Sequence, residues 1–135
     1  MKSVLMALLG LLPATLPAAT NSWWLGSPDG RCAISVTLST GGELTYQAFR
    51  AGKPVLLPSP LGLCREDEAF DHGLTLAEAG NIESRREQYE LFAGVTPQVD
   101  HLLNHRRLVF SNTNHARLAL ELAASDEGVA FRYRF

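Results

Sequence analysis

The sequence CAISVTLSTGGELTYQAF, residues 32–49, alternates apolar side chains with small or polar ones on both sides of a Gly-Gly pair. In residues 32–38 and again in residues 44–49 every second side chain is apolar, which is the period of a half-buried β-strand. Gly41 and Gly42 supply the positive φ angles that a tight hairpin turn needs. The segment therefore predicts two antiparallel strands joined by a short turn.

The same pattern continues along the chain in both directions from this hairpin. A turn at Ala51-Gly52-Lys53 leads into a third strand that starts at residues 54–57, and the three strands form a meander. The proline-stiffened residues 58–63 are extended, because each proline biases its predecessor towards β or polyproline conformations. Residues 74–76 form a short strand, whereas the charged residues 82–91 fit a strand and a helix equally.

Alternation returns in the last third of the chain, at residues 109–122 and again at its end. The final strand directs Val129, Phe131, Tyr133 and Phe135 to one side and the arginines between them to the other. We expect an all-β fold, an antiparallel β-sandwich. The sequence stops on an aromatic core residue without a turn or polar tail, which predicts that the sandwich is partial.

Residues 1–20 have the organisation of a signal peptide. Lys2 precedes a short apolar run, prolines follow, and small residues end the segment. The run is too short for a hydrocarbon core that needs about 20 residues, so we expect export and no membrane segment once the signal is removed. The domain then comprises residues 21–135. The full sequence of 135 residues has 12 basic and 14 acidic side chains, and this lack of excess positive charge argues against nucleic acid as a partner.

Two cysteines, Cys32 and Cys64, would lie in an oxidising compartment after export. They can form one disulfide, which typically contributes about 2–4 kcal/mol, or remain two buried free thiols. The sequence leaves both alternatives open.

Few residues form a pattern that suggests chemistry. No Gly-x-Ser-x-Gly elbow and no phosphate-binding loop occurs in the sequence. His101 and His105 would share one face of a helix, but Arg106-Arg107 beside them would repel a cation, so a solvated helical turn or loop is favoured. Glu66-Asp67-Glu68 lacks the spacing of a calcium loop and is interpreted as a charged turn.

Two pairs of side chains are candidates for contacts with a glycan or with another domain. Trp23 and Trp24 are adjacent, so on a strand one is expected in the core, and the other could stack on a sugar ring. Arg132 and Arg134 share a face and can pair with carboxylates of a neighbouring strand or domain. For the arginines a structural role is favoured.

An ordered set of short motifs resembles one family. The motifs are Ser27-Pro28-Asp29-Gly30-Arg31, Gly42-Glu43-Leu44-Thr45-Tyr46, Gly52-Lys53-Pro54-Val55-Leu56, Ser59-Pro60-Leu61-Gly62-Leu63 and Asp126-Glu127-Gly128-Val129-Ala130-Phe131-Arg132-Tyr133-Arg134-Phe135. In this order, behind a signal peptide, they resemble the N-terminal domain of glycoside hydrolase family 97, the bacterial exo-acting α-glucosidases and α-galactosidases. The resemblance covers nearly all of residues 21–135.

The resemblance implies a galactose-mutarotase-like super-sandwich followed by a catalytic (β/α)8 barrel. It places the catalytic carboxylates and most ligands of a calcium ion in that barrel, so no catalytic, cofactor-binding or metal-binding residue is assigned to this chain, and calcium is expected only in a full-length parent. The implied partners are an oligo- or polysaccharide and the barrel of the same parent chain. The alternative is a free-standing exported carbohydrate-binding or interaction module without enzymatic activity.

Overall fold

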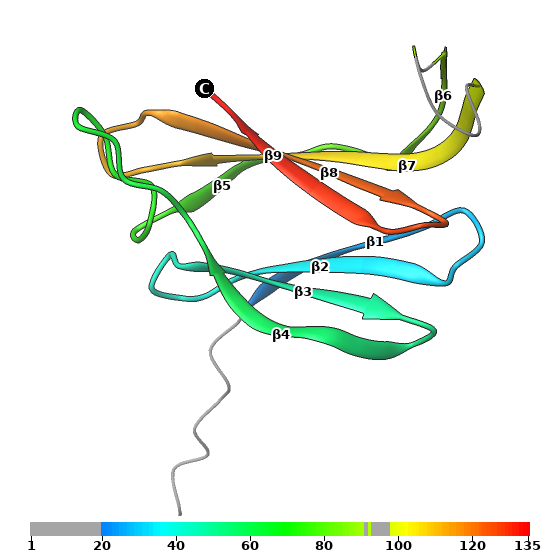
Figure 1. The fold of residues 1–135 in the computed structure, drawn as a ribbon. Coiled ribbons are helices and arrows are strands. Elements are labelled where there is room, and N and C mark those ends of the chain that lie inside the picture. The colour runs from blue at the N-terminus through cyan, green and yellow to red at the C-terminus, as the bar shows by residue number, and fades with distance from the viewer. Residues whose placement is uncertain (1–19, 91, 93–97) are drawn as a thin grey trace, which may run out of the picture.

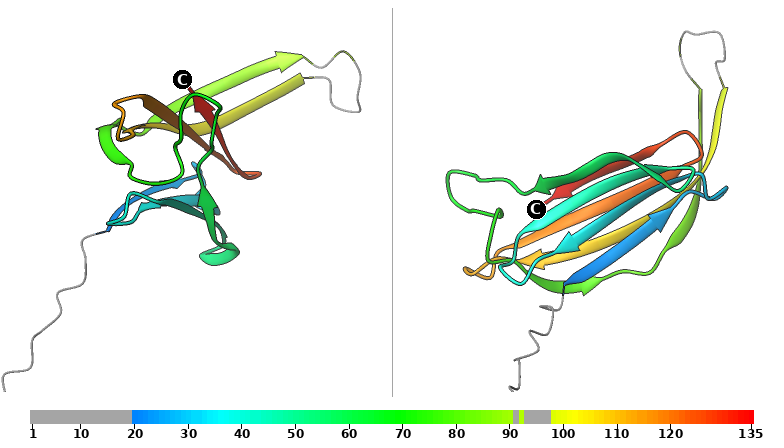
Figure 2. Two further views of the ribbon diagram at one scale, coloured as in Figure 1. Left: turned by 90° about the vertical axis from the view of Figure 1, so that its left-hand side faces the viewer. Right: turned by 90° about the horizontal axis from the view of Figure 1, so that it is seen from below.

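The computed structural model describes residues 20–90, 92 and 98–135 and contains two antiparallel β-sheets packed face to face (Figures 1 and 2). The first sheet has the order β1-β2-β3-β4 and consists of β1 (Asn21–Gly26), β2 (Cys32–Leu38), β3 (Leu44–Arg50) and β4 (Lys53–Leu61). The second has the order β5-β7-β8-β9, with β6 also paired to β7, and consists of β5 (Thr75–Ala79), β6 (Glu83–Glu90), β7 (Gln98–Ser111), β8 (Arg117–Ser125) and β9 (Val129–Arg134). The predicted all-β sandwich and its meander are confirmed.

The predicted signal peptide lies almost wholly outside the described residues, which begin at residue 20. Within the part of the chain that is described, no helix is long and apolar enough to span a membrane.

The core lies between the sheets, where β1 approaches β7 and β8, and β2 approaches β8 and β9. Every second side chain of β2 and β8 points inward, so that Ile34, Val36 and Leu120 are almost completely buried. Trp23 meets Phe110 across the layers, edge to face, with ring centroids 5.7 Å apart. Alternation in the sequence therefore identified the inward rows correctly.

The predicted half-buried character of β2 is wrong for most of the strand, because two of its three outward side chains are buried and only Thr37 is partly exposed. Ala33 and Ser35 point away from the core, yet each is less than a tenth exposed. Trp24 is paired with Ser35 from β1, and Phe49 is paired with Ala33 from β3. The two rings lie 4.7 Å apart and therefore meet above β2, covering its outer side.

The β2–β3 turn is joined to the loop before β5, which connects the two sheets at one end. The amide of Gly73 donates to the Gly41 carbonyl (3.1 Å), and the amide of Leu74 donates to the Gly42 carbonyl (3.0 Å). Gly42 has φ +75°, and a Cβ placed on it would lie only 2.3 Å from the Leu74 nitrogen. The turn therefore needs glycine for its backbone angle and for this close approach.

The sandwich has an open side along β4 and β9, which lie at the front of Figure 1 and are edge strands within the described part of the chain. Val55 and Leu57 of β4 are exposed, and Leu56, which is paired with Ala48 on the inner side, is only partly covered. The expectation that Phe135 is a core residue is wrong, because it is 65% exposed. Its ring contacts Phe70 at the rim of the core, at 5.9 Å between centroids.

Candidate functional site

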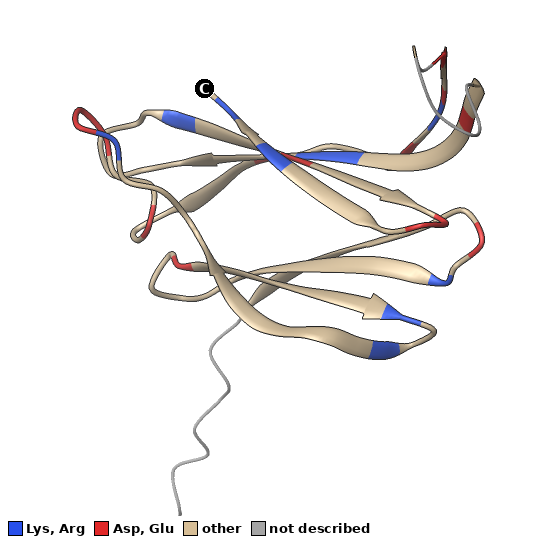
Figure 3. Cartoon of the chain, in the orientation of Figure 1, with Lys and Arg blue, Asp and Glu red and all other residues tan. Residues whose placement is uncertain are grey.

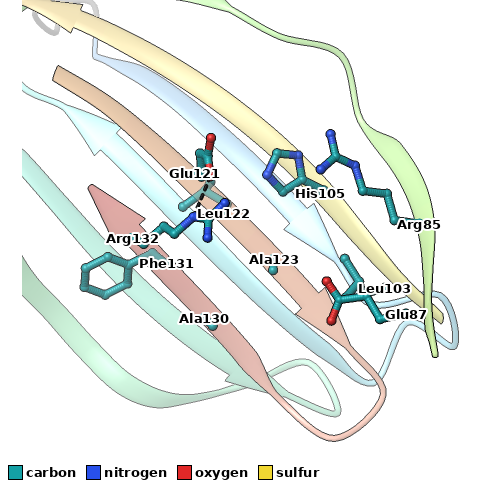
Figure 4. Close-up of a pocket in the computed structure, with 10 residues that line it drawn as sticks. All are labelled: Arg85, Glu87, Leu103, His105, Glu121, Leu122, Ala123, Ala130, Phe131 and Arg132. Carbon is teal, nitrogen blue, oxygen red and sulfur yellow. Dashed lines mark hydrogen bonds and ion pairs between the residues drawn. The ribbon is translucent and has the colours of Figure 1, made fainter. Parts of the chain in front are cut away.

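A shallow cavity of about 200 Å³ lies on the outer face of the second sheet (Figure 4). Its floor is formed by small side chains, because Ala123 of β8 and Ala130 of β9 are directly paired there. Charged side chains from the neighbouring strands form its walls. The lining residues with polar groups are Arg85, Glu87, His105, Glu121 and Arg132. We call this cavity the charged groove.

The centre of the charged groove is an ion pair between β8 and β9. Glu121 is paired with Arg132 in the strand register, and its Oε2 accepts a hydrogen bond from Arg132 Nε at 2.6 Å. Arg134 Nη1 donates to the other carboxylate oxygen at 3.2 Å. The Glu121 side chain is only 8% exposed, whereas that of Arg132 is 70% exposed. One nearly buried carboxylate therefore holds two guanidinium groups at the surface.

These hydrogen bonds lower the pKa of Glu121 below its ordinary value of 4.5, with Arg132 as the main cause. The carboxylate therefore stabilises the fold above pH 4.5, and this contribution is lost as the pH falls through the lower folded-state pKa. We expect Glu121→Gln to reduce the free energy of unfolding by about 1 kcal/mol at neutral pH. Denaturant unfolding should show the wild type and the variant converging in stability as the pH falls below 4.5.

Glu66→Gln is the matched control, because it removes a carboxylate from an exposed turn. It should change stability by less than about 0.5 kcal/mol at any pH in the series. If the difference in free energy of unfolding between wild type and Glu121→Gln stayed constant down to the lowest pH, the ion-pair explanation would be contradicted.

His105 lies on the wall of the charged groove, and its pKa is lowered mainly by burial and further by the charge of Arg85. The expectation of a helical turn or loop around it is wrong, because His101 and His105 both belong to β7. Four residues of strand separate them by about 13 Å, too far to share one metal ion. Among the described residues there is no group of three histidine, cysteine or carboxylate side chains that could hold a metal.

The acidic turn Glu66-Asp67-Glu68 lies in the connection between β4 and β5 and is held by one local contact and one long-range contact. Asp67 pairs with Arg65 at 3.0 Å. Glu68 accepts a hydrogen bond from Asn112 Nδ2 at 2.6 Å. The turn is therefore tied to the loop between β7 and β8.

The two tryptophans lie on opposite faces of β1, as their adjacency predicts. Trp23 is in the core, whereas Trp24 points outward and is 51% exposed. The prediction that one of the pair is a core residue is confirmed, and a glycan contact for Trp24 stays a prediction. Arg132 and Arg134 both pair with the carboxylate of Glu121 on the neighbouring strand β8, which is the structural role favoured for them.

The two cysteines are free thiols in different surroundings, which favours the second of the two alternatives for them. Cys32 is buried at the start of β2, where its Sγ lies 3.7 Å from the Asp126 carbonyl oxygen. The expectation that Cys64 is a small buried side chain is wrong, because it is exposed. Asp71 beside it is the main cause of a raised pKa of the Cys64 thiol.

Sequence reasoning missed Glu121, the residue on which the charged groove depends. A signal for it is present, because Glu121 is the one charge within Leu118–Ala124 and faces outward between alternating leucines. The register of the β8–β9 hairpin then brings it opposite Arg132.

Comparisons with known proteins give consistent matches. Residues 25–135 match the model of the family described as glycosyl-hydrolase 97 N-terminal. A probable retaining alpha-galactosidase of Streptomyces bingchenggensis is 32% identical over 97% of this chain and 21% of its own length. A retaining alpha-galactosidase of Bacteroides thetaiotaomicron is 27% identical over 98% of this chain and 19% of its own length. The chain thus spans about a fifth of these curated relatives.

Two solved structures share the fold. A beta-arabinopyranosidase superposes with a TM-score of 0.76 and 23% identity, over 82% of this chain and 18% of its own. A glycoside hydrolase family 97 enzyme from a Pseudoalteromonas strain, in complex with panose, superposes with a TM-score of 0.71 and 22% identity, over 82% of this chain and 17% of its own.

Proposed function

The chain belongs to the glycosyl-hydrolase 97 N-terminal family, and on that premise we propose that it is the accessory β-sandwich of an exported, exo-acting α-glycosidase. The main support is that the matched curated relatives are α-galactosidases of which the chain spans about a fifth. Hydrolysis of an α-galactoside or α-glucoside would then take place in a (β/α)8 barrel contributed by another part of the parent protein. Any calcium ion would bind there as well.

The open side of the sandwich supports a further part of the same protein as the immediate partner. The inner faces of β1 and β2 are covered by the second sheet, whereas β4 has exposed apolar side chains on both of its faces. Exposed apolar area next to unpaired strand edges is a surface that proteins normally cover. Additional strands beside β9 would cover β4 and complete the sandwich.

The substrate contact proposed for this domain is with a neutral oligosaccharide at the mouth of the barrel. The glycoside hydrolase family 97 enzyme from the Pseudoalteromonas strain has been solved in complex with panose and in complex with acarbose, which supports this class of ligand. The loops and outer faces of a sandwich packed beside a barrel would help to define how the glycan enters.

The proposal is tested with the chain alone, residues 21–135. We expect it to associate and to show no hydrolysis of p-nitrophenyl α-galactoside or α-glucoside, because the open side stays uncovered and the barrel is missing. Light scattering coupled to size exclusion should show that Val55→Lys with Leu57→Lys reduces this association, since the charges oppose edge-to-edge pairing.

The control is Ile82→Lys, an exposed apolar position that precedes β6, away from the open side. It should leave the association unchanged. A monodisperse wild-type monomer that melts cooperatively would contradict the proposal and favour a free-standing module, and so would a clear rate of hydrolysis by the chain alone.

A further inference from the structure

The outer face of the first sheet, unlike the charged groove, carries no charged side chain over three successive rows, each made of residues paired across neighbouring strands. The rows, taken across β1, β2 and β3, are Ser22-Thr37-Thr45, Trp24-Ser35-Gln47 and Gly26-Ala33-Phe49. The charges of these strands lie at their ends and in their turns, whereas the second sheet carries charges along its strands (Figure 3). We call these nine positions the neutral face.

The neutral face contains an aromatic platform formed by Trp24 and Phe49. Their ring centroids are 4.7 Å apart and their planes are inclined by 45°. The indole extends along its own strand over Gly26, where a Cβ would lie 3.6 Å from Trp24 Nε1. Since Trp24 is still 51% exposed, part of the ring faces solvent.

Hydroxyl and amide groups surround the platform at the spacing of the sheet. Gln47 lies in the same row as Trp24, two strands away. Thr37 lies in the next row, and its Oγ1 donates a hydrogen bond to Ser22 Oγ at 3.4 Å. Alternate rows of a sheet are about 7 Å apart along the strands, and neighbouring strands are about 5 Å apart. A ligand that rests on Trp24 can therefore reach these polar groups with its edges.

We propose that the neutral face is a contact site for a neutral, α-linked oligosaccharide, with one sugar ring resting on Trp24 and hydroxyls directed to Gln47 and Thr37. The α-linked class rests on the proposed function. A pyranose has an apolar face of C–H groups that suits an aromatic ring, and a rim of hydroxyls that exchange hydrogen bonds with hydroxyl and amide groups. The absence of charge suits a neutral ligand, since no ionised group has to be desolvated when it binds.

A protein partner fits this surface less well. Hydroxyl and amide side chains outnumber the two aromatic ones, and serine is depleted in protein–protein interfaces. The exposed apolar side chains suited to burying protein lie instead on the open side.

The experiment titrates the chain, residues 21–135, with panose and with raffinose by calorimetry and by ligand-observed NMR. Wild type should bind one of these probes, and Trp24→Ala should weaken its affinity at least about tenfold, as expected for loss of an aromatic contact of about 1.4 kcal/mol. Trp24→Phe should retain most of the affinity. The matched control is Tyr89→Ala on β6, because Tyr89 is 50% exposed and lies on the other sheet; it should not change binding.

A salt series separates the neutral face from the charged groove. Affinity should change less than about twofold between low salt and about 1 M salt, where charge interactions are screened within about 3 Å. Binding that collapses in high salt, or that Tyr89→Ala weakens as much as Trp24→Ala does, would overturn the inference. No binding of either probe would overturn it too, and if Trp24→Ala then abolished self-association, the face would be a protein interface. The binding results leave the association and hydrolysis tests of the proposed function unaffected, whereas loss of self-association in Trp24→Ala would conflict with the open side as its cause.

Discussion

Replacing Gly42 by alanine should destabilise the chain by about 3–5 kcal/mol, enough to unfold much of the population at room temperature. Two effects combine at this position. The φ angle of +75° costs an L-residue about 1–2 kcal/mol, and the new Cβ would lie 2.3 Å from the Leu74 nitrogen. The atoms that the new Cβ would meet are backbone atoms of Gly73 and Leu74, which cannot rotate away as a side chain could. The β2–β3 turn and the loop before β5 must therefore separate. The two hydrogen bonds from Gly73 and Leu74 would then be lost.

Gly52→Ala is the matched control, because Gly52 also has φ +75° but has open space where its Cβ would lie. It should cost only about 1–2 kcal/mol. The two variants are compared by thermal and denaturant unfolding, at a protein concentration too low for the chain to associate. Equal losses of stability at both positions would show that the close approach at Gly42 contributes nothing beyond its backbone angle.

Truncating Phe110 to alanine should cost about 3–5 kcal/mol and disturb the environment of Trp23. Phe110 is completely buried on β7, and its ring meets Trp23 of β1 edge to face at 5.7 Å. Its removal leaves a cavity between the two sheets and deletes an aromatic contact that joins them. Chemical unfolding measures the loss, and near-ultraviolet circular dichroism reports the loosened packing of the buried indole.

Phe110→Leu keeps most of the volume and should cost less than about 2 kcal/mol. A loss of only about 1 kcal/mol in Phe110→Ala would mean that the sheets close over the cavity. It would contradict the account of Phe110 as a rigid contact between the layers.

Local patterns were sufficient to predict most of the strands. The Gly-Gly turn and the alternation around it define β2 and β3, and alternation alone defines the inward side of β8 and β9. Residues 82–91 could not be assigned from their sequence, because β6 is exposed along its whole length and shows no apolar period. Pairing with β7 makes it a strand, and that pairing is invisible in a local window.

Properties that depend on neighbouring strands were beyond the sequence pattern. The outward side chains Ala33 and Ser35 are buried because Trp24 and Phe49 come from the two neighbouring strands and meet above β2. The four-residue spacing of His101 and His105 suggested a helical turn, since only a helix brings side chains at that spacing together. On β7 the same spacing keeps them apart. The charged groove could be predicted in part, because the arginines on one side of β9 were evident, whereas their partner Glu121 required the hairpin register.

The first sheet consists of consecutive strands, so all of its hydrogen-bonded neighbours exist once Leu61 has been synthesised. The strands that cover its inner face, chiefly β7 and β8, come much later in the chain. At about 5–20 residues per second the interval lasts several seconds, during which Ile34 and Val36 would have no partner. The inner face of the first sheet is during this interval an exposed apolar surface, which makes the nascent chain prone to aggregation and a natural client for chaperones.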